Sequence, residues 1–157
     1  MKAVIVCHSV SHGNTRRVAD AMAEVLDAKV LGPDEADPTE LAEADLVGFG
    51  SGVFHTKLHP LLTEFAGSLL PTTRGRAFVF ATSGLPETPV TRFARPLVRL
   101  LESKGFVVDG SFSCRAFDTW APFKVVGGIN KHRPNDADLA AAREFATRLR
   151  EVRGPVS

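Results

Sequence analysis

Short apolar runs alternate with segments of helical periodicity along the whole chain. The apolar runs predict β-strands at about residues 2–8, 28–31, 45–50, 76–82 and 107–117. Between them, apolar side chains recur every three or four positions, which predicts amphipathic helices. The helices are expected from near Asn14 to Leu26, from Pro38 to Ala44, around Leu58 to Leu69, around Phe93 to Leu101 with its end at Gly105, and after Asn135 through Leu149. This alternation is typical of βαβ units, so we expect one doubly wound α/β domain around a parallel sheet.

Local signals refine the helix boundaries. Asp37 before Pro38 predicts a side-chain cap followed by proline at the first helical position. Asn135 is the expected cap of the last helix, and Gly105 ends the helix before it. Pro96 should kink that preceding helix or delay its start, because proline lacks the backbone N–H that a helix interior uses.

Composition and charge describe an ordinary globular protein. The 157 residues suffice for one domain, expected over residues 1–152, with a C-terminal tail at 153–157. No apolar stretch approaches membrane-spanning length and no signal peptide is visible, so we expect a cytoplasmic protein without membrane insertion. A net charge of +1 provides no strong field for nucleic acid. Cys7 and Cys114 lie in strand-like runs and are expected to be buried thiols, outside any disulfide framework or zinc site.

Ligands of doubly wound sheets bind at the carboxyl ends of the strands, so four loops are of interest: residues 8–15, 51–57, 82–90 and 117–134. The first loop brings hydroxyl groups and a glycine to a helix N-terminus, where backbone N–H groups and the helix dipole favour a phosphate. The candidate phosphate ligands are Ser9, Ser11, His12, Gly13, Asn14 and Thr15. The alternative is that Asn14 or Thr15 only caps the helix.

Several phosphate-binding motifs are absent from the sequence. The chain contains neither G-x-x-x-x-G-K-[ST] nor G-x-G-x-x-G, which excludes a nucleoside triphosphatase loop and the dinucleotide fingerprint. Cys7 is placed like the nucleophile of a low-molecular-weight tyrosine phosphatase, but Gly13 stands where the arginine of that motif is required. A receiver domain needs an acidic pair at the end of the first strand, and Cys7, His8 and Ser9 stand there instead.

The loop SVSHGNT, residues 9–15, resembles the T-x-T-G-N-T phosphate loop of the flavodoxin family through Gly13, Asn14 and Thr15. The motif FDTW-x-P, followed by GGINK and RPN, resembles a subgroup of flavodoxin-domain proteins of bacteria and archaea, and the resemblance spans essentially the whole chain. His12 replaces a hydroxyl residue and Ser9 lies one position early. The loop is therefore expected to be wider, with His12 either reaching the phosphate or lying in solvent.

This resemblance implies a three-layer sandwich with a five-stranded parallel sheet in the order 2-1-3-4-5, and FMN as the cofactor. The remaining loops would then hold the flavin, through Ser51, Gly52, Val53, Phe54, His55, Thr82, Ser83, Gly84, Phe117, Asp118, Thr119 and Trp120. Gly48, Gly50 and Gly52 are expected to let a flat ligand approach the backbone. His59 is expected to be a surface or capping residue.

Aromatic cover of the flavin must differ from that of flavodoxins that stack a tyrosine on the ring, because the chain contains no tyrosine. Trp120 is the candidate replacement, in a loop whose unusual length is typical of functional segments. Alternatively, Trp120 pins this loop to the core, Phe54 is an ordinary core residue, and Gly84 forms a simple turn.

The loops contain no recognisable catalytic set or metal cluster, so the chemistry is assigned to the cofactor and no catalytic residue is proposed. The resemblance implies an electron carrier between a flavin or ferredoxin reductase and a redox acceptor such as a monooxygenase. Basic residues on the predicted flavin side suggest an acidic docking face on the partner and a less strongly reducing flavin: His55, Lys57, Arg92, Lys124 and Lys131. Alternatively, the protein is an FMN-dependent enzyme acting directly on a quinone or porphyrinogen. A sheet domain that has lost its cofactor is disfavoured, because three glycine- and hydroxyl-rich loops coincide.

Overall fold

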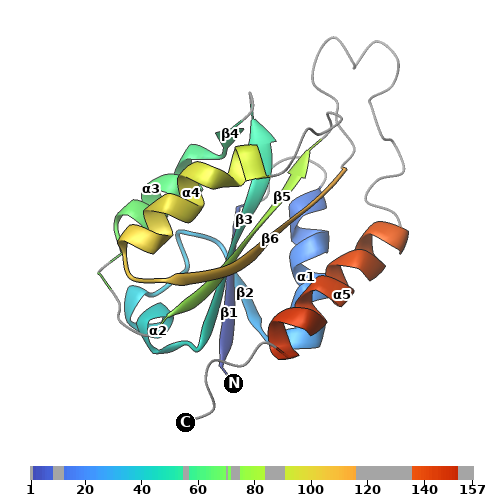
Figure 1. The fold of residues 1–157 in the computed structure, drawn as a ribbon, viewed down its shortest axis with the longest axis horizontal. Coiled ribbons are helices and arrows are strands. Elements are labelled where there is room, and N and C mark those ends of the chain that lie inside the picture. The colour runs from blue at the N-terminus through green and yellow to red at the C-terminus, as the bar shows by residue number, and fades with distance from the viewer. Residues whose placement is uncertain are drawn as a thin grey trace.

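A computed structural model describes residues 2–8, 13–54, 57–69, 71, 75–83, 91–115 and 136–151. Strands and helices alternate along it (Figure 1). The strands are β1 (Ala3–His8), β2 (Lys29–Leu31), β3 (Leu46–Phe54), β4 (Lys57–Leu58), β5 (Arg76–Ser83) and β6 (Val107–Arg115). The helices are α1 (Asn14–Leu26), α2 (Pro38–Glu43), α3 (Pro60–Gly67), α4 (Thr91–Ser103) and α5 (Asp136–Glu151).

The long strands form a parallel sheet in the order β2-β1-β3-β5-β6. Counting only the five predicted strands, this is the order 2-1-3-4-5, which confirms the expected fold class. The first strand, β1, lies inside the sheet. The chain then adds the outer strand β2 on one side of β1 and crosses to the other side of β1 with β3. The sheet therefore has its topological switch point between β1 and β3, where such folds bind ligands.

The short strand β4 is absent from the sequence prediction. It pairs antiparallel with the end of β3, through Val53 with Leu58 and Phe54 with Lys57. Because of this pairing, β3 continues to Phe54, and the prediction of a loop starting at residue 51 is wrong. Ser51 to Phe54 are strand residues at the carboxyl end of the central strand β3.

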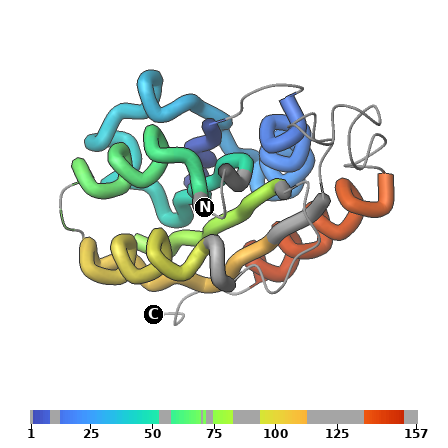
Figure 2. Tube along the Cα trace, turned by 90° about the horizontal axis from the view of Figure 1, so that it is seen from above, coloured from blue at the N-terminus to red at the C-terminus, as the bar shows by residue number. Residues whose placement is uncertain are grey.

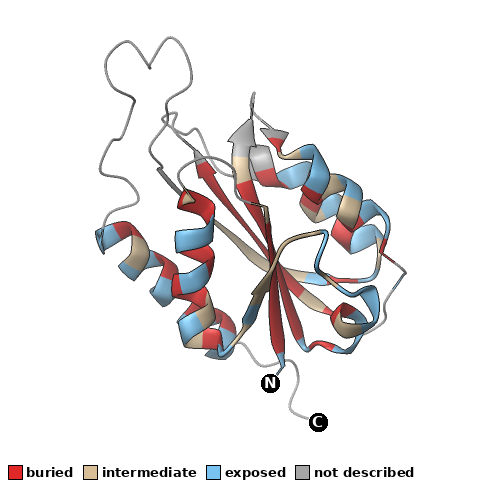
Figure 3. Ribbon diagram, turned by 180° about the vertical axis from the view of Figure 1, so that it is seen from behind, coloured by how far each residue is buried: buried red, intermediate tan, exposed pale blue. Residues whose placement is uncertain are grey.

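Helices cover both faces of the sheet, as an all-parallel sheet requires. Helices α1 and α5 lie on one face and α3 and α4 on the other (Figure 2). Along β1 the side chains alternate, so that Val4 and Val6 pack in the cluster with α3 and α4, and Ile5 packs with α1 and α5. The inner strands β1, β3 and β5 are consequently buried along most of their length, whereas the outer strands β2 and β6 are only partly buried (Figure 3).

Two glycines of β3 make room for aromatic rings of β5. A Cβ added to Gly48 would lie 2.3 Å from the Phe78 ring, and one added to Gly50 would lie 2.1 Å from the Phe80 ring. Phe78 and Phe80 are fully buried and stack with ring centroids 6.0 Å apart. The prediction that Gly48 and Gly50 admit a flat ligand is wrong, because phenylalanine rings fill the space in front of them.

Helix signals in the sequence were confirmed in one case and corrected in another. The Asp37 carboxylate accepts a hydrogen bond from the Thr39 N–H at 2.9 Å, with Pro38 at the first helical position, so the predicted cap of α2 is confirmed. Helix α4 begins at Thr91 and contains Pro96, so the proline does not delay its start. Asn135 lies outside the described residues.

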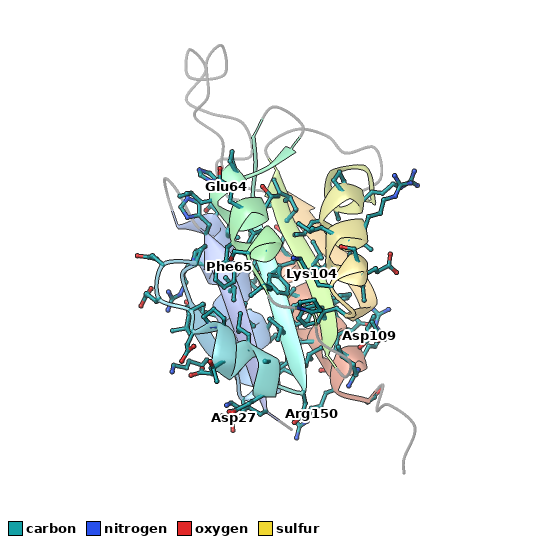
Figure 4. The ribbon with its side chains drawn as sticks, turned by 90° about the vertical axis from the view of Figure 1, so that its left-hand side faces the viewer. Asp27, Glu64, Phe65, Lys104, Asp109 and Arg150 are labelled. Carbon is teal, nitrogen blue, oxygen red and sulfur yellow. The ribbon has the colours of Figure 1, made fainter. Side chains whose placement is uncertain are left out.

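Polar contacts fasten α5 to its neighbours at the end of the sheet opposite the predicted loops. The Arg76 guanidinium of β5 contacts the Asp109 carboxylate of β6 at 2.6 Å and donates to the Leu149 carbonyl at 3.1 Å. Arg150 donates to the Val25 carbonyl at 3.2 Å, which ties the C-terminal ends of α5 and α1 together. Figure 4 shows Asp27, which follows α1, and Arg150 of α5 at the same end of the molecule.

None of the helices in the described part of the chain has both the length and the apolar character needed to span a bilayer.

Substituting Gly50→Ala should destabilise the protein by about 1–3 kcal/mol, because the new methyl group would overlap the buried Phe80 ring. Gly67→Ala is the matched control, since nothing lies within 4 Å of its added Cβ at the end of α3. Alanine in a helix is intrinsically favoured, so this control should be neutral or stabilising by up to about 1 kcal/mol. Urea unfolding measures both, and equal unfolding midpoints for Gly50→Ala and the wild type would contradict this packing.

Candidate functional site

Three predicted site segments meet at the carboxyl edge of the sheet. His8 at the end of β1 is in register with Ser51 of β3, and Gly52 of β3 is in register with Thr82 of β5. Helix α1 follows β1 and contacts both β3 and β5. Residues far apart in the sequence therefore form one continuous polar edge.

The N-terminus of α1 is built on Gly13. Gly13 is the N-cap residue and has φ of 62°, a left-handed conformation that strains other residues. Asn14 and Thr15 are the first two helical residues, so the alternative that either side chain only caps the helix is wrong. The first-turn N–H groups of a helix have no acceptor within the helix and carry its positive dipole, which suits an anion.

A buried pair of hydroxyl groups joins α1 to β5. Thr15 Oγ1 and Thr82 Oγ1 lie 2.7 Å apart, and the two residues are only 3% and 4% exposed. Gly52 faces this pair, since a Cβ added there would lie 3.8 Å from each of the two oxygens. Three of the four predicted loop segments, residues 8–15, 51–57 and 82–90, thus each contribute one residue to this cluster.

Ser51 and His59 fix the end of β3. The fully buried Ser51 hydroxyl donates to the Gly52 carbonyl at 2.8 Å and accepts the His59 backbone N–H at 3.0 Å. His59 is the N-cap of α3, and its Nδ1 accepts the Leu61 N–H at 3.1 Å. The expectation that His59 is a surface or capping residue is confirmed, and this cap anchors α3 beside the site.

The His59 ring also contacts His8, a residue that sequence reasoning did not select. The two ring centroids lie 4.0 Å apart, with the planes tilted by 47°. Burial lowers the pKa of His59, and repulsion from a charged His8 lowers it further. Its position in the sequence could have identified His8 as a candidate site residue, because His8 ends the first strand and therefore lies at the carboxyl edge.

Cys7, the neighbour of His8, faces the opposite side of the sheet. It is a free, buried thiol, as predicted, and burial raises its pKa to about 12. Such a thiol stays protonated at neutral pH and is a poor nucleophile. Within the part of the chain that the structure describes, no three His, Cys, Asp or Glu residues form a group that could hold a metal ion.

The side chains of the other predicted site residues are not described by the structure. Those outside the described residues are Ser9, Ser11, His12, His55, Gly84, Phe117, Asp118, Thr119 and Trp120. Val53, Phe54 and Ser83 are placed as strand residues, without a description of their side chains. Their roles stay predictions.

The described residues fit the phosphate end of a flavin nucleotide. A left-handed glycine before a helix N-terminus and a threonine hydroxyl in the first helical turn would supply donors for an anion beside the switch point between β1 and β3. The class defined by this fold is a doubly wound α/β domain with its switch point between β1 and β3.

Comparison with known proteins identifies the family within that class. The family model for the flavodoxin domain matches residues 5–103. An uncharacterized protein of Methanocaldococcus jannaschii is 38% identical over 146 residues, covering 93% of this chain and 96% of that protein. The chain therefore belongs to the flavodoxin family.

Solved structures show the same fold at low sequence identity. Flavodoxin 2 from Bacillus cereus has a TM-score of 0.73 at 19% identity, over 96% of this chain and 99% of that one. A flavodoxin from Streptococcus pneumoniae TIGR4 has a TM-score of 0.72 at 16% identity, over 96% and 99%. Rubredoxin oxygen:oxidoreductase from Desulfovibrio gigas has a TM-score of 0.69 at 17% identity, and the match covers 96% of this chain but 36% of that one.

The lowered pKa of His59 predicts a pH-dependent stability. The unfolded state binds a proton more readily than the folded state, so stability is complete above the ordinary value of 6.5 and falls as the pH drops below it. His59→Asn keeps a capping side chain without a titrating imidazole. Between about pH 7.5 and about pH 5.5, urea unfolding should show a larger loss of stability for the wild type than for His59→Asn. Equal losses would contradict the assignment.

Proposed function

We propose that this protein binds FMN at the carboxyl edge of its sheet and carries electrons between a reductase and a redox acceptor protein. The observation that carries the proposal is the cluster formed by the Thr15 and Thr82 hydroxyl groups, Gly52 and the N-terminus of α1. This cluster lies at the switch point of a flavodoxin-family sheet, where a phosphate would meet backbone N–H groups and a hydroxyl donor.

Each described residue of the edge has a distinct part in binding. The first turn of α1 and the Thr15 hydroxyl would hold the phosphate, and Gly13 permits the turn that begins this helix. Ser51 and Gly52 would border the flavin from β3, with the Gly52 carbonyl held by the Ser51 hydroxyl. FMN itself would supply the redox chemistry, while the protein sets its orientation and electrostatic surroundings.

Similarity to a flavodoxin over nearly its whole length supports an electron carrier. The chain aligns with 99% of Flavodoxin 2 from Bacillus cereus, at a TM-score of 0.73.

The proposed partners are a flavin or ferredoxin reductase and an acceptor protein with acidic docking faces. Helix α4 presents Arg95 and Arg99 to solvent, four residues apart and therefore on the same side of the helix. Opposite charges across such an interface would raise the association rate and make it sensitive to salt.

A potentiometric titration of the FMN-reconstituted protein tests the proposal. A carrier should take up its two electrons in separate steps, monitored by flavin absorption. The sequence predicts basic rather than acidic residues on the flavin side, so the second step should occur at a less negative potential than in acidic flavodoxins, because nearby positive charge stabilises the reduced anion.

Other outcomes have defined meanings. One combined two-electron step would favour an enzyme acting on a quinone or porphyrinogen. A second potential as low as that of acidic flavodoxins would contradict the electrostatic argument, and failure to bind FMN would contradict the proposed function altogether.

A further inference from the structure

One buried hydrogen bond connects the proposed phosphate site to the far side of the switch point. It joins Thr15 in the first turn of α1 to Thr82 near the end of β5, across 67 positions of sequence. Both side chains are almost completely shielded from water. Little water competes for these hydroxyl groups, so their mutual hydrogen bond is a stable part of the site.

The two partners differ in how firmly the fold holds them. Thr82 lies in β5, which is paired on both sides, with Gly52 of β3 and Cys114 of β6 as its register partners. Thr15 is the second residue of α1, directly after the left-handed turn at Gly13. The Thr82 backbone is thus held by strand neighbours on both sides, which gives the Thr15 hydroxyl a firmly placed partner.

The direction of the hydrogen bond follows from the chemistry of the ligand. A hydroxyl group has one hydrogen to donate and two lone pairs that accept. Phosphate oxygens of FMN are anionic acceptors near neutral pH. For Thr15 to donate its hydrogen to the phosphate, its oxygen must accept the hydrogen of Thr82. A chain of two hydroxyl groups that ends on an anion is also cooperatively strengthened.

We propose that Thr82 is a positioning residue that selects a phosphorylated flavin, by donating to Thr15 Oγ1 and so directing the Thr15 hydrogen toward the phosphate. This inference rests on the proposed function and extends it to a residue outside the phosphate loop. The Thr82 side chain then contributes to FMN affinity but not to the affinity for riboflavin, which lacks the phosphate.

Affinity measurements with FMN and with riboflavin test the proposal, using the quenching of flavin fluorescence on binding. Thr82→Val keeps the shape but removes the hydroxyl, and should weaken FMN binding about fivefold, the size expected for one hydrogen bond between neutral groups. Riboflavin affinity should change less than about twofold, which keeps it below the loss expected for FMN, and Thr82→Ser should restore FMN binding.

Thr147→Val serves as the matched control. The Thr147 hydroxyl donates to the Arg143 carbonyl within α5 at 2.9 Å and is exposed, so its loss should leave both affinities unchanged. Equal weakening of FMN and riboflavin by Thr82→Val, or no rescue by Thr82→Ser, would show a packing role and overturn the proposal. If the wild type binds neither flavin, the proposed function itself is wrong, which is a different result.

A double-mutant cycle keeps the test valid if Thr82→Val folds poorly with the Thr15 hydroxyl unsatisfied. Thr15→Val combined with Thr82→Val removes both partners and leaves no buried hydroxyl without a bond. Once Thr15 is valine, the second substitution should cause no further loss of FMN affinity. Additive losses would overturn the proposed chain of hydroxyl groups.

Discussion

Parallel pairing of β1 with β3 and of β3 with β5 is the constraint on which the rest of the structure depends. It brings the carboxyl ends of these strands together, so that Thr15, Gly52 and Thr82 meet from distant parts of the chain. It also requires both faces of the sheet to be buried, which α1 and α5 on one side and α3 and α4 on the other achieve. Core packing and the proposed cofactor site therefore have the same origin.

Glycines of β3 have two different roles, one in core packing and one at the candidate site. Gly48 and Gly50 are required by packing, since the rings of Phe78 and Phe80 occupy the space that a side chain would need. Gly52 lies two residues beyond Gly50 in β3, where the neighbours are the hydroxyl groups of Thr15 and Thr82. The same strand thus changes from an aromatic core to a polar edge within a few residues. This transition marks where the core ends and the candidate site begins.

The fold was predictable because its signals are local and periodic, as the nearly correct limits of β1, β5 and α2 show. Strand β4 was missed because two residues, Lys57 and Leu58, carry no period, and its existence depends on pairing with β3. The resemblance to a flavodoxin phosphate loop was recognisable from Gly13, Asn14 and Thr15. The contact of Thr15 with Thr82 and that of His8 with His59 depend on register across the sheet, which one sequence does not reveal.

The central claim is that the carboxyl edge, and no other surface, receives FMN. A titration of the isotope-labelled protein with FMN, followed by amide NMR spectra, tests it most directly. We expect the largest shifts at Gly13, Asn14, Thr15, Gly52 and Thr82, and little change at Arg76 and Asp109, which lie at the opposite end of the sheet. Larger shifts around Arg76 and Asp109 than at the carboxyl edge would contradict the account.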